Sequence, residues 1–260
     1  MSTVLRGTIA TMHRLLTESA AELDLDALAQ TYAYPHPLPA RGWLRANMVS
    51  TIDGAAAHDG VTAELSTAAD QQLLGLLRGL SDVVVVGAGT VRAESYGPTR
   101  AHARHASRRA EAGQLPAPVL AIVSGRLDLD PTSALFTEAV VRPTVVTHEQ
   151  APSERVVALA EVADVLVCGA GSIDIAAALD ALAARGLRRQ LSEGGPHLLA
   201  DIARAGRLDE LDLTFAATVA GPGATRVVGG DPISTLQPMQ LAGLLQDGDT
   251  LFARYLRVPR

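Results

Sequence analysis

The sequence predicts an α/β fold with a mostly parallel central sheet that is flanked by helices. Segments typical of buried strands alternate with helical segments from residue 44 to residue 217. Beyond residue 217 the helical pattern stops and glycines become frequent, so a final pair of strands is expected to join the sheet edge antiparallel. The 260 residues can bury a large core, which must be aliphatic because aromatic residues make up only 3% of the sequence.

The expected strands are short and rich in aliphatic residues. Val83–Val86 is a continuous valine run, which is typical of a strand covered on both faces. The other expected strands are Leu44–Ser50, Val119–Val123, Thr144–Thr147, Val165–Val167, Arg189–Ser192, Glu210–Ala217 and Leu251–Val258.

The expected helices carry recognisable start and stop residues. Ser66 or Thr67 would cap a helix that ends at Leu80 and buries its leucines. Further helices are expected over Pro152–Ala160, Ser172–Arg185 and Pro196–Ala205. Residues 1–40 are interpreted as an N-terminal extension, with one helix that begins at Asp24 or Asp26 and is ended by the prolines at 35, 37 and 39; residues 41–260 form the main domain.

Charge and cysteine content exclude several classes of function. The net charge is −6, so nucleic-acid binding would need a basic cluster, and the one candidate comprises Arg100, His102, Arg104, His105, Arg108 and Arg109. No aromatic residues interleave this cluster, so we expect a solvated surface loop within a long mobile segment at 97–118. Cys168 is the single cysteine, which rules out an internal disulfide and a cysteine-cluster metal site and fits a reducing cytoplasm. Neither a signal peptide nor a membrane-spanning apolar run is evident.

Polar residues follow the first expected strand, in the segment Asn47–Gly54. In an open α/β sheet, ligands bind beyond the carboxyl ends of the strands, so this position favours a site. Asp53 could bind a ring N–H or orient a water for protonation, and it could equally make an Asx-turn with Gly54.

Glycine-bearing turns follow two other expected strands. Gly87-Ala88-Gly89-Thr90-Val91 comes after Val86, and Gly169-Ala170-Gly171-Ser172 comes after Val165–Val167. Glycines let the backbone approach a pyrophosphate, and a following helix start offers free N–H groups. Arg92 stands where the dinucleotide fingerprint has its third glycine, so a plain strand-to-helix turn explains the first segment nearly as well.

Two more strand ends carry candidate binding groups. Ser124-Gly125-Arg126 offers a hydroxyl and a guanidinium, which suit the 2′-phosphate of NADPH, although an ordinary turn with an exposed arginine remains an alternative. In Ser192-Glu193-Gly194-Gly195-Pro196, proline opens a helix at its first position and leaves a bare helix N-terminus. Glu193 has no evident structural reason to end a buried strand, so we interpret it as a ligand for a substrate amine or ring N–H.

The five strand-end segments, taken in the order in which they follow along the chain, resemble the RibD C-terminal family. This family is the reductase domain of the riboflavin-pathway deaminase–reductases and is similar to dihydrofolate reductase in fold. The match runs from Trp43 to the C-terminus and is carried by Ser50–Gly54, Val83–Val91 and Ser192–Leu199. The resemblance implies a homodimeric oxidoreductase that takes hydride from NADPH. It also implies a substrate of the 5-amino-6-(5-phosphoribosylamino)uracil type, whose ribose is opened to ribitol through its imine form.

The resemblance and the strand-end argument together give a set of expected site residues. Asp53 and Glu193 are the expected catalytic residues, and Asn47, Thr62, Arg78 and Glu193 are expected to bind substrate. No metal is expected. The expected cofactor contacts are Val49, Gly87, Gly89, Thr90, Val91, Glu94, Ser124, Arg126, Gly169, Gly194, Gly195, Pro196, His197, Leu198 and Leu199.

The sequence departs from the bifunctional members of the family in two ways. Residues 1–40 are too short to hold their zinc deaminase, so only the reductase part is expected. Many of those members have lysine at the position of Asn47, a neutral amide that supplies no charge but still donates and accepts hydrogen bonds. A pterin or folate reductase and a non-catalytic NADPH-binding protein are the alternative functions.

Overall fold

The computed structural model describes residues 22–57, 62, 64–233 and 235–258. The described residues fall into two units, which divide after Tyr32. In the first unit, helix α1 (Leu25–Thr31) begins at Asp24, whose carboxylate accepts a hydrogen bond from Ala27 N at 2.8 Å. The second unit therefore includes residues 33–40, which the sequence analysis assigned to the extension.

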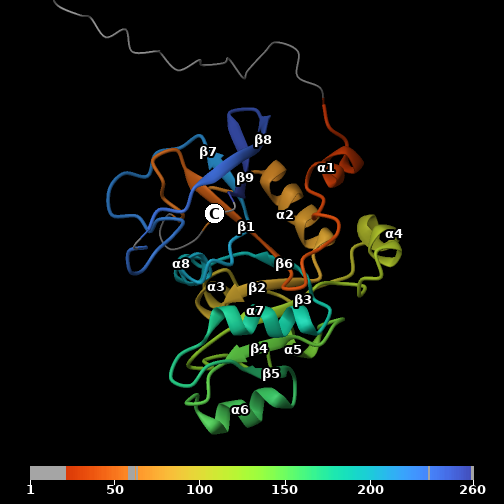
Figure 1. Cartoon of the computed structure of the whole chain (residues 1–260), viewed down its shortest axis with the longest axis vertical. Coiled ribbons are helices and arrows are strands. Elements are labelled where there is room, and N and C mark those ends of the chain that lie inside the picture. Colours follow the sequence, from red (N-terminus) through yellow and green to blue (C-terminus); the bar gives the residue numbers. More distant parts are fainter. Residues whose placement is uncertain (1–21, 58–61, 63, 234, 259–260) are drawn as a thin grey trace, which may run out of the picture. The chain divides into compact units, whose positions relative to one another are not determined.

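The second unit is built on one sheet, in which the described strands have the order β5-β4-β3-β2-β6-β1-β7-β9-β8. Every pairing among β1 to β7 is parallel, and β9 joins β7 and β8 antiparallel, so the predicted fold class is confirmed. Figure 1 shows this succession of strands. The bounds are β1 Trp43–Thr51, β2 Val83–Gly87, β3 Val119–Val123, β4 Thr144–Thr147, β5 Asp164–Val167, β6 Arg189–Ser192, β7 Glu210–Ala216, β8 Met239–Asp247 and β9 Thr250–Arg257.

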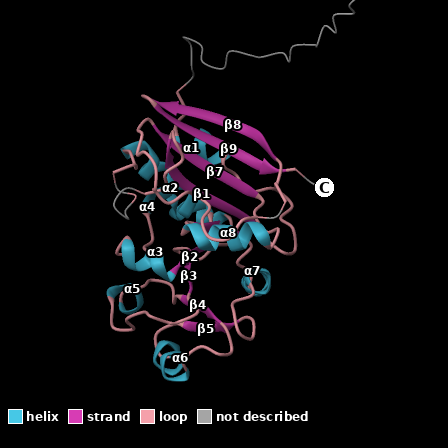
Figure 2. Cartoon of the chain, turned by 90° about the vertical axis from the view of Figure 1, so that its left-hand side faces the viewer, coloured by secondary structure: helices cyan, strands magenta, loops and turns pink. Residues whose placement is uncertain are grey.

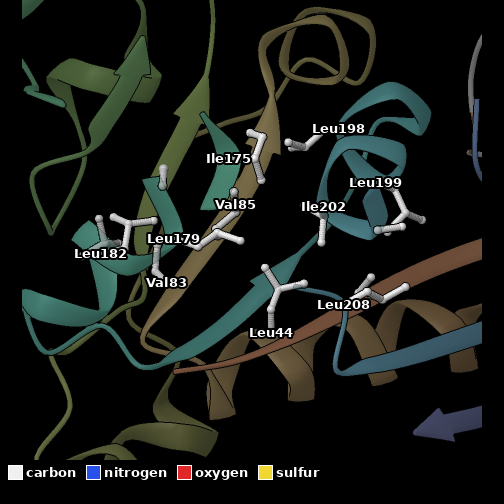
Figure 3. Close-up of a cluster of buried hydrophobic side chains, with 14 residues drawn as sticks. Leu44, Val83, Val85, Ile175, Leu179, Leu182, Leu198, Leu199, Ile202 and Leu208 are labelled. Atoms are coloured by element: carbon white, nitrogen blue, oxygen red, sulfur yellow. The ribbon is translucent and has the colours of Figure 1, made fainter. Parts of the chain in front are cut away.

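Helices cover both faces of the parallel part of the sheet, as Figure 2 shows. Helices α7 and α8 lie on one face, where leucines and isoleucines of both helices pack on Leu44, Val83 and Val85 (Figure 3). This cluster is almost fully buried and forms the main core. The helix bounds are α2 Ala68–Leu80, α3 Ala88–Ala93, α4 Ala103–Glu111, α5 Ala134–Thr137, α6 Ser153–Ala160, α7 Ile175–Ala184 and α8 Pro196–Arg204.

Helix α2 lies against the opposite face of the sheet. It begins after Thr67, whose hydroxyl accepts a hydrogen bond from Asp70 N at 3.2 Å, as one of the two predicted caps requires. Asp70 is itself buried and accepts a hydrogen bond from Thr214 Oγ1 of β7 at 2.6 Å. This bond ties the start of α2 to the sheet.

The prediction of a solvated loop at 97–118 is confirmed for the exposed residues Arg100, His102 and Arg104 and is wrong for the helical part, where His105 and Arg109 are buried. This segment contains α4, which packs on α2 where Gly79 leaves room: a Cβ at Gly79 would lie 2.5 Å from His105 Cγ. Arg109 is buried and its Nη1 donates to the carbonyl oxygens of Gly79 at 3.1 Å and Ser81 at 2.7 Å. A guanidinium thus caps the end of α2, which is a tertiary contact that a count of charges does not predict.

Two further elements differ from the expectation. Helix α7 begins at Ile175 instead of Ser172, because the Asp174 carboxylate accepts a hydrogen bond from Ala177 N at 3.0 Å and caps the helix there. The sequence analysis expected an antiparallel partner for the last strand but gave no residue range for it, and the structure shows this partner as β8.

Among the residues that the structure describes, no helix is long and apolar enough to cross a membrane.

Candidate active site

The ends of β2 and β6 meet at two glycine-bearing turns that the sequence analysis selected separately. Gly87 N donates to Gly194 O at 2.9 Å, which joins the two turns. The Gly194–Gly195 peptide bond is cis, and Gly194 has a φ of +82°. A Cβ at Gly195 would lie 2.7 Å from Thr90 Oγ1, so any larger residue there would have to displace Thr90 or the turn. The predicted residues Gly87, Thr90, Gly194 and Gly195 therefore form one backbone-lined surface.

Helix α8 starts at this surface without a side-chain cap. Pro196 occupies its first turn and Gly195 precedes it, so the N-terminal N–H groups are available to an anion. His197 is exposed, whereas Leu198 and Leu199 are buried in the main core and can meet a ligand only through their backbone.

Helix α3 contributes less than expected. It has six residues, too few for a strong N-terminal dipole effect, and Val91 is buried within it. A Cβ at Gly89 would meet nothing within 4 Å, so this glycine is not required by its surroundings.

A cavity of about 550 Å³ lies at the ends of β3, β4 and β5 and unites the other two selected turns. Gly125 and Gly171 line it, together with His148, and a Cβ at Gly125 would lie 3.2 Å from His148 Nε2. Gly169 supports the turn with a φ of +101°. The remaining lining residues are Val123, Ser172, Ile173, Asp174, Ile175, Ala176, Asp201, Arg204 and Ala205.

The Ser124–Arg126 turn borders this cavity. Ser124 is buried and its hydroxyl accepts a hydrogen bond from Leu127 N at 3.0 Å, which fixes the turn. Arg126 is exposed, and among the described residues no ion pair engages its guanidinium. The turn therefore presents a free positive charge beside the cavity.

Glu193 is held by two side chains from other elements. Arg78 Nε donates to Oε1 and Arg78 Nη2 donates to Oε2, both at 2.6 Å, and Tyr96 OH donates to Oε2 at 2.6 Å. The Glu193 side chain is only 4% exposed, whereas that of Arg78 is 41% exposed. Burial and the adjacent Glu193 carboxylate raise the pKa of Tyr96 far above its usual range, so the phenol stays protonated. Glu193 is thus a rigidly oriented acceptor at the strand end.

Asn47 lies in the row of side chains next to Glu193. Its neighbour Ala46 is the register partner of Ser192, and Asn47 itself is the partner of Asp212 in β7. Because register partners in a parallel sheet point to the same face, Glu193, Asn47 and Asp212 form a row across the ends of β6, β1 and β7. Asn47 is half-buried, and so is Val49 two residues further along the strand.

A second cavity, of about 430 Å³, begins beside Arg78 and Tyr96. Its polar lining includes Glu94, Arg100 and His102. Glu94 accepts hydrogen bonds from Thr62 N and Thr62 Oγ1, both at 3.0 Å, so two residues expected to bind different ligands contact each other.

Asp53 lies in a turn that Gly54 N closes by donating to Thr51 O at 3.0 Å, but its carboxylate bonds to other residues and does not make the expected Asx-turn. Its carboxylate accepts hydrogen bonds from Thr51 Oγ1, from Ala220 N at 3.2 Å and from Gly221 N at 2.8 Å. The Thr51 hydroxyl, followed by these backbone N–H groups, lowers the pKa of Asp53. An exposed, stabilised carboxylate is a poor proton donor at neutral pH, and its visible role is to hold residues 220–221 beside the site.

Three residues of this region were missed by the sequence analysis: Tyr96, His148 and Asp212. Tyr96 carried a weak signal, because it is one of only four tyrosines and closely follows the Gly87–Val91 segment. His148 stands directly after an expected strand, as the other selected residues do. Asp212 interrupts an apolar strand, which is a signal for a buried polar partner.

The close fit of Gly195 against Thr90 gives a direct prediction. Gly195→Ala should raise the dissociation constant of a bound dinucleotide at least about tenfold, because the new methyl group displaces Thr90 or the turn. Gly89→Ala, at a glycine with open space, should change it less than about twofold. Fluorescence titration measures both, and equal effects would contradict the proposed approach of a ligand to Gly195.

Comparison with known proteins agrees with this geometry. The model of the RibD C-terminal domain matches residues 42–252. A 2,5-diamino-6-ribosylamino-4(3H)-pyrimidinone 5′-phosphate reductase of Archaeoglobus fulgidus is 25% identical over 84% of this chain and 100% of its own. The reductase of the same name from Methanothermobacter thermautotrophicus is 29% identical over 75% of this chain and 88% of its own.

The fold is also shared with solved structures. A pyrimidine reductase-like protein of Corynebacterium diphtheriae superposes with a TM-score of 0.79 at 29% identity, covering 90% of this chain and 99% of that one. The family match spans strands β1 to β8 and the start of β9, and it includes every strand end that builds the site. The chain belongs to the RibD C-terminal domain family.

Proposed function

We propose that this protein is an NADPH-dependent reductase of a pyrimidine ribosyl phosphate in riboflavin biosynthesis. The observation that carries the proposal is the junction of the Gly87 and Gly194–Gly195 turns directly beside Glu193. A glycine-lined surface accepts a flat ring closely, and a fixed carboxylate beside it binds the N–H groups of a second ring. The names of the reductases similar to this protein support the same reaction.

The residues present fit NADPH. The backbone surface at Gly87, Thr90 and Gly195 would hold the nicotinamide end, and the uncapped start of α8 would hold the pyrophosphate. The cavity of about 550 Å³ would take the adenosine end, with Arg126 available to the 2′-phosphate. NADPH supplies a hydride when bound.

The substrate would lie on the α2 side of the strand ends. Glu193, oriented by Arg78 and Tyr96, would accept hydrogen bonds from the pyrimidine edge, and the Asn47 amide would contact the reacting part of the ribosyl group. The exposed part of Arg78, together with Arg100 and the cavity of about 430 Å³, would receive the phosphate.

In the proposed reaction, the main task of the protein is to hold the cofactor and the substrate in the right orientation. The imine carbon of the ring-opened ribosyl group would be reduced by the hydride that NADPH supplies, and the imine nitrogen would take one proton, which would leave a ribityl amine. Because the hydrogen bonds from Thr51, Ala220 and Gly221 stabilise the charged form of Asp53, we assign the proton to solvent water and give Asp53 the role of fixing the 220–221 loop. The protein contributes position, a common source of large rate effects.

The proposal is tested by following NADPH oxidation with three substrates. They are the diaminopyrimidinone ribosyl phosphate, the corresponding aminouracil compound and dihydrofolate. Turnover of either pyrimidine supports the proposal and identifies which ring the site accepts. Turnover of dihydrofolate alone would replace it by a folate reductase, and NADPH binding without any turnover would replace it by a non-catalytic nucleotide-binding protein.

The assignment of Arg126 gives a second test. Arg126→Gln should weaken NADPH binding at least about tenfold and leave NADH binding within about twofold, because only NADPH carries the 2′-phosphate. Arg142→Gln is the matched control, since this exposed arginine precedes β4 and lies at the amino ends of the strands. Equal weakening of both coenzymes by Arg126→Gln would contradict the assignment.

We further propose a cytoplasmic homodimer. Cys168 is free and buried, which suits a reducing compartment, and the dimer rests on family resemblance. Sedimentation equilibrium of the purified protein tests the dimer, and a monomer at micromolar concentration would overturn it.

A further inference from the structure

Asp212 is a buried acid in the middle of β7 that the proposed mechanism does not use. It is 2% exposed and points to the same face as its register partner Asn47. Neither of its carboxyl oxygens receives a donor among the residues described, and a hydrogen bond that it shares with the Glu210 carboxylate contributes to its raised pKa. Its nearest cation is Arg45, whose Nε lies 3.3 Å from Oδ2. An ionised carboxylate would be poorly supported there, and burial raises the pKa of Asp212 to about 8.

A protonated Asp212 has one hydrogen to donate, and two acceptors lie near it. Glu210 already receives three donors: Arg45 Nε at 3.0 Å, Arg254 Nε at 2.7 Å and Trp43 Nε1 at 2.9 Å. Asn47 Oδ1 is buried and receives none among the described residues. Glu210 can share the hydrogen of Asp212, but it already has these donors, whereas Asn47 Oδ1 has none among the described residues. A buried acceptor without a donor costs free energy.

We propose that Asp212 is a positioning residue, whose protonated carboxyl donates a hydrogen bond to Asn47 Oδ1, directly or through one water, and thereby directs the Asn47 NH₂ group toward the substrate. The inference rests on the proposed function of this site, because it assigns a direction to a residue that contacts the substrate there. It satisfies two buried groups with a single bond. It also gives Asn47 one defined orientation, which an amide alone does not have.

The direction of the amide then depends on the protonation of Asp212. A carboxylic acid donates to the amide oxygen, whereas a carboxylate only accepts and would attract the NH₂ group away from the substrate. The charged or titratable groups that face Asp212 are Arg45 from β1, Glu210 from β7 and Arg254 from β9. Tyr34 stacks on Arg45, with the guanidinium carbon 4.4 Å from the ring centroid, and Asp70 of α2 bonds to Thr214 further along β7.

The test measures kcat/KM for the pyrimidine ribosyl phosphate from about pH 6 to about pH 9 in the intact protein. In the wild type, kcat/KM should fall about tenfold or more at the alkaline end. Asp212→Asn keeps a permanent donor of the same size, so it should retain neutral activity within about threefold and lose the alkaline fall. Asp212→Leu removes the donor and should hold kcat/KM about tenfold below the neutral wild-type value at every pH, mainly through kcat.

Thr214→Val is the matched control, because it removes a buried hydroxyl two residues along the same face without touching Asn47. It should keep the alkaline fall of the wild type. The dissociation constant of NADPH should be unchanged in all three variants, which separates positioning from general damage. An alkaline fall that persists in Asp212→Asn, or that Thr214→Val also removes, would overturn the inference.

A readout without turnover completes the test. The side-chain ¹⁵N amide resonance of Asn47 should shift as the pH passes through about 8 in the wild type and should not shift in Asp212→Asn. A wild-type protein that reduces no pyrimidine would overturn the proposed function. An active wild type in which the Asn47 resonance does not respond to pH would overturn the role of Asp212 alone.

Discussion

Replacing Glu193 by glutamine is expected to lower kcat/KM for the pyrimidine substrate by at least about 100-fold, which corresponds to about 2.7 kcal/mol. The carboxylate accepts three hydrogen bonds, two from Arg78 and one from Tyr96, and its side chain is 4% exposed. Glutamine keeps the shape but loses the charge, and its NH₂ group opposes one of these donors. Removing one partner of a hydrogen-bonded, desolvated charge pair costs about 2–5 kcal/mol.

The dissociation constant of NADPH should stay within about twofold in Glu193→Gln, since the cofactor surface at Gly87 and Gly195 is made of backbone. Steady-state kinetics and a fluorescence titration measure the two quantities. Glu161→Gln, which changes an exposed carboxylate at the end of α6, is the matched control and should leave both unchanged. Activity within about threefold of the wild type would show that Glu193 does not orient the substrate.

A double variant separates orientation from charge. Arg78→Gln should be nearly as impaired as Glu193→Gln, and the two substitutions together should cost little more than either alone, because they break the same pair. Tyr96→Phe should have a smaller effect, about tenfold, since it removes one neutral donor and leaves the ion pair intact. Additive losses in the double variant would mean that Arg78 and Glu193 act on separate ligands.

The strands were predictable because their signal is local. Val83–Val86, Val119–Val123 and Thr144–Thr147 are apolar or β-branched runs bounded by turn residues, and the structure has strands at these positions. A strand buried on both faces needs such residues whatever surrounds it. Strand β8 lacks this signal, because it is an edge strand with mostly exposed or half-buried residues and an irregularity at Gly243.

Parts of the site were predictable for a different reason. The rule that ligands bind at the carboxyl ends of parallel strands brought Gly87, Gly194 and Gly195 together before any distance was known. The rule does not predict which side chains contact or hydrogen-bond one another. The contact between Thr62 and Glu94, the Tyr96 bond to Glu193 and the packing of His105 on Gly79 join residues that lie far apart in the sequence or outside the strand ends.

The largest effect on stability is expected from Glu210→Leu, which should lower the free energy of unfolding by about 3–5 kcal/mol. Glu210 is fully buried and is the common acceptor of Arg45, Arg254 and Trp43. Leucine would leave the Arg45 guanidinium, which is 0% exposed, without its main counter-charge. Urea denaturation measures the loss, and Glu154→Leu on the exposed side of α6 is the control, expected to change stability by less than about 0.5 kcal/mol.

The pH dependence of this loss tests whether Asp212 is protonated in the folded wild type. Burial raises the pKa of Asp212 to about 8, above the value of about 4 in an unfolded polypeptide. The folded wild type therefore binds a proton that the unfolded state has lost. The stabilising contribution of this proton is complete below about pH 4 and disappears as the pH rises to about 8.

In Glu210→Leu, Asp212 becomes the nearest acid to Arg45 and should ionise at a lower pH than in the wild type. The decline of stability between about pH 5 and about pH 8 should therefore be shallower in the variant, and the difference between the two proteins should narrow as the pH rises. Asp212→Asn should flatten the same decline without the large loss at neutral pH, because the amide carries no proton to release. A constant difference between wild type and Glu210→Leu across this range would mean that Asp212 is already ionised beside Arg45, and that the two carboxylates share the guanidinium in the native protein.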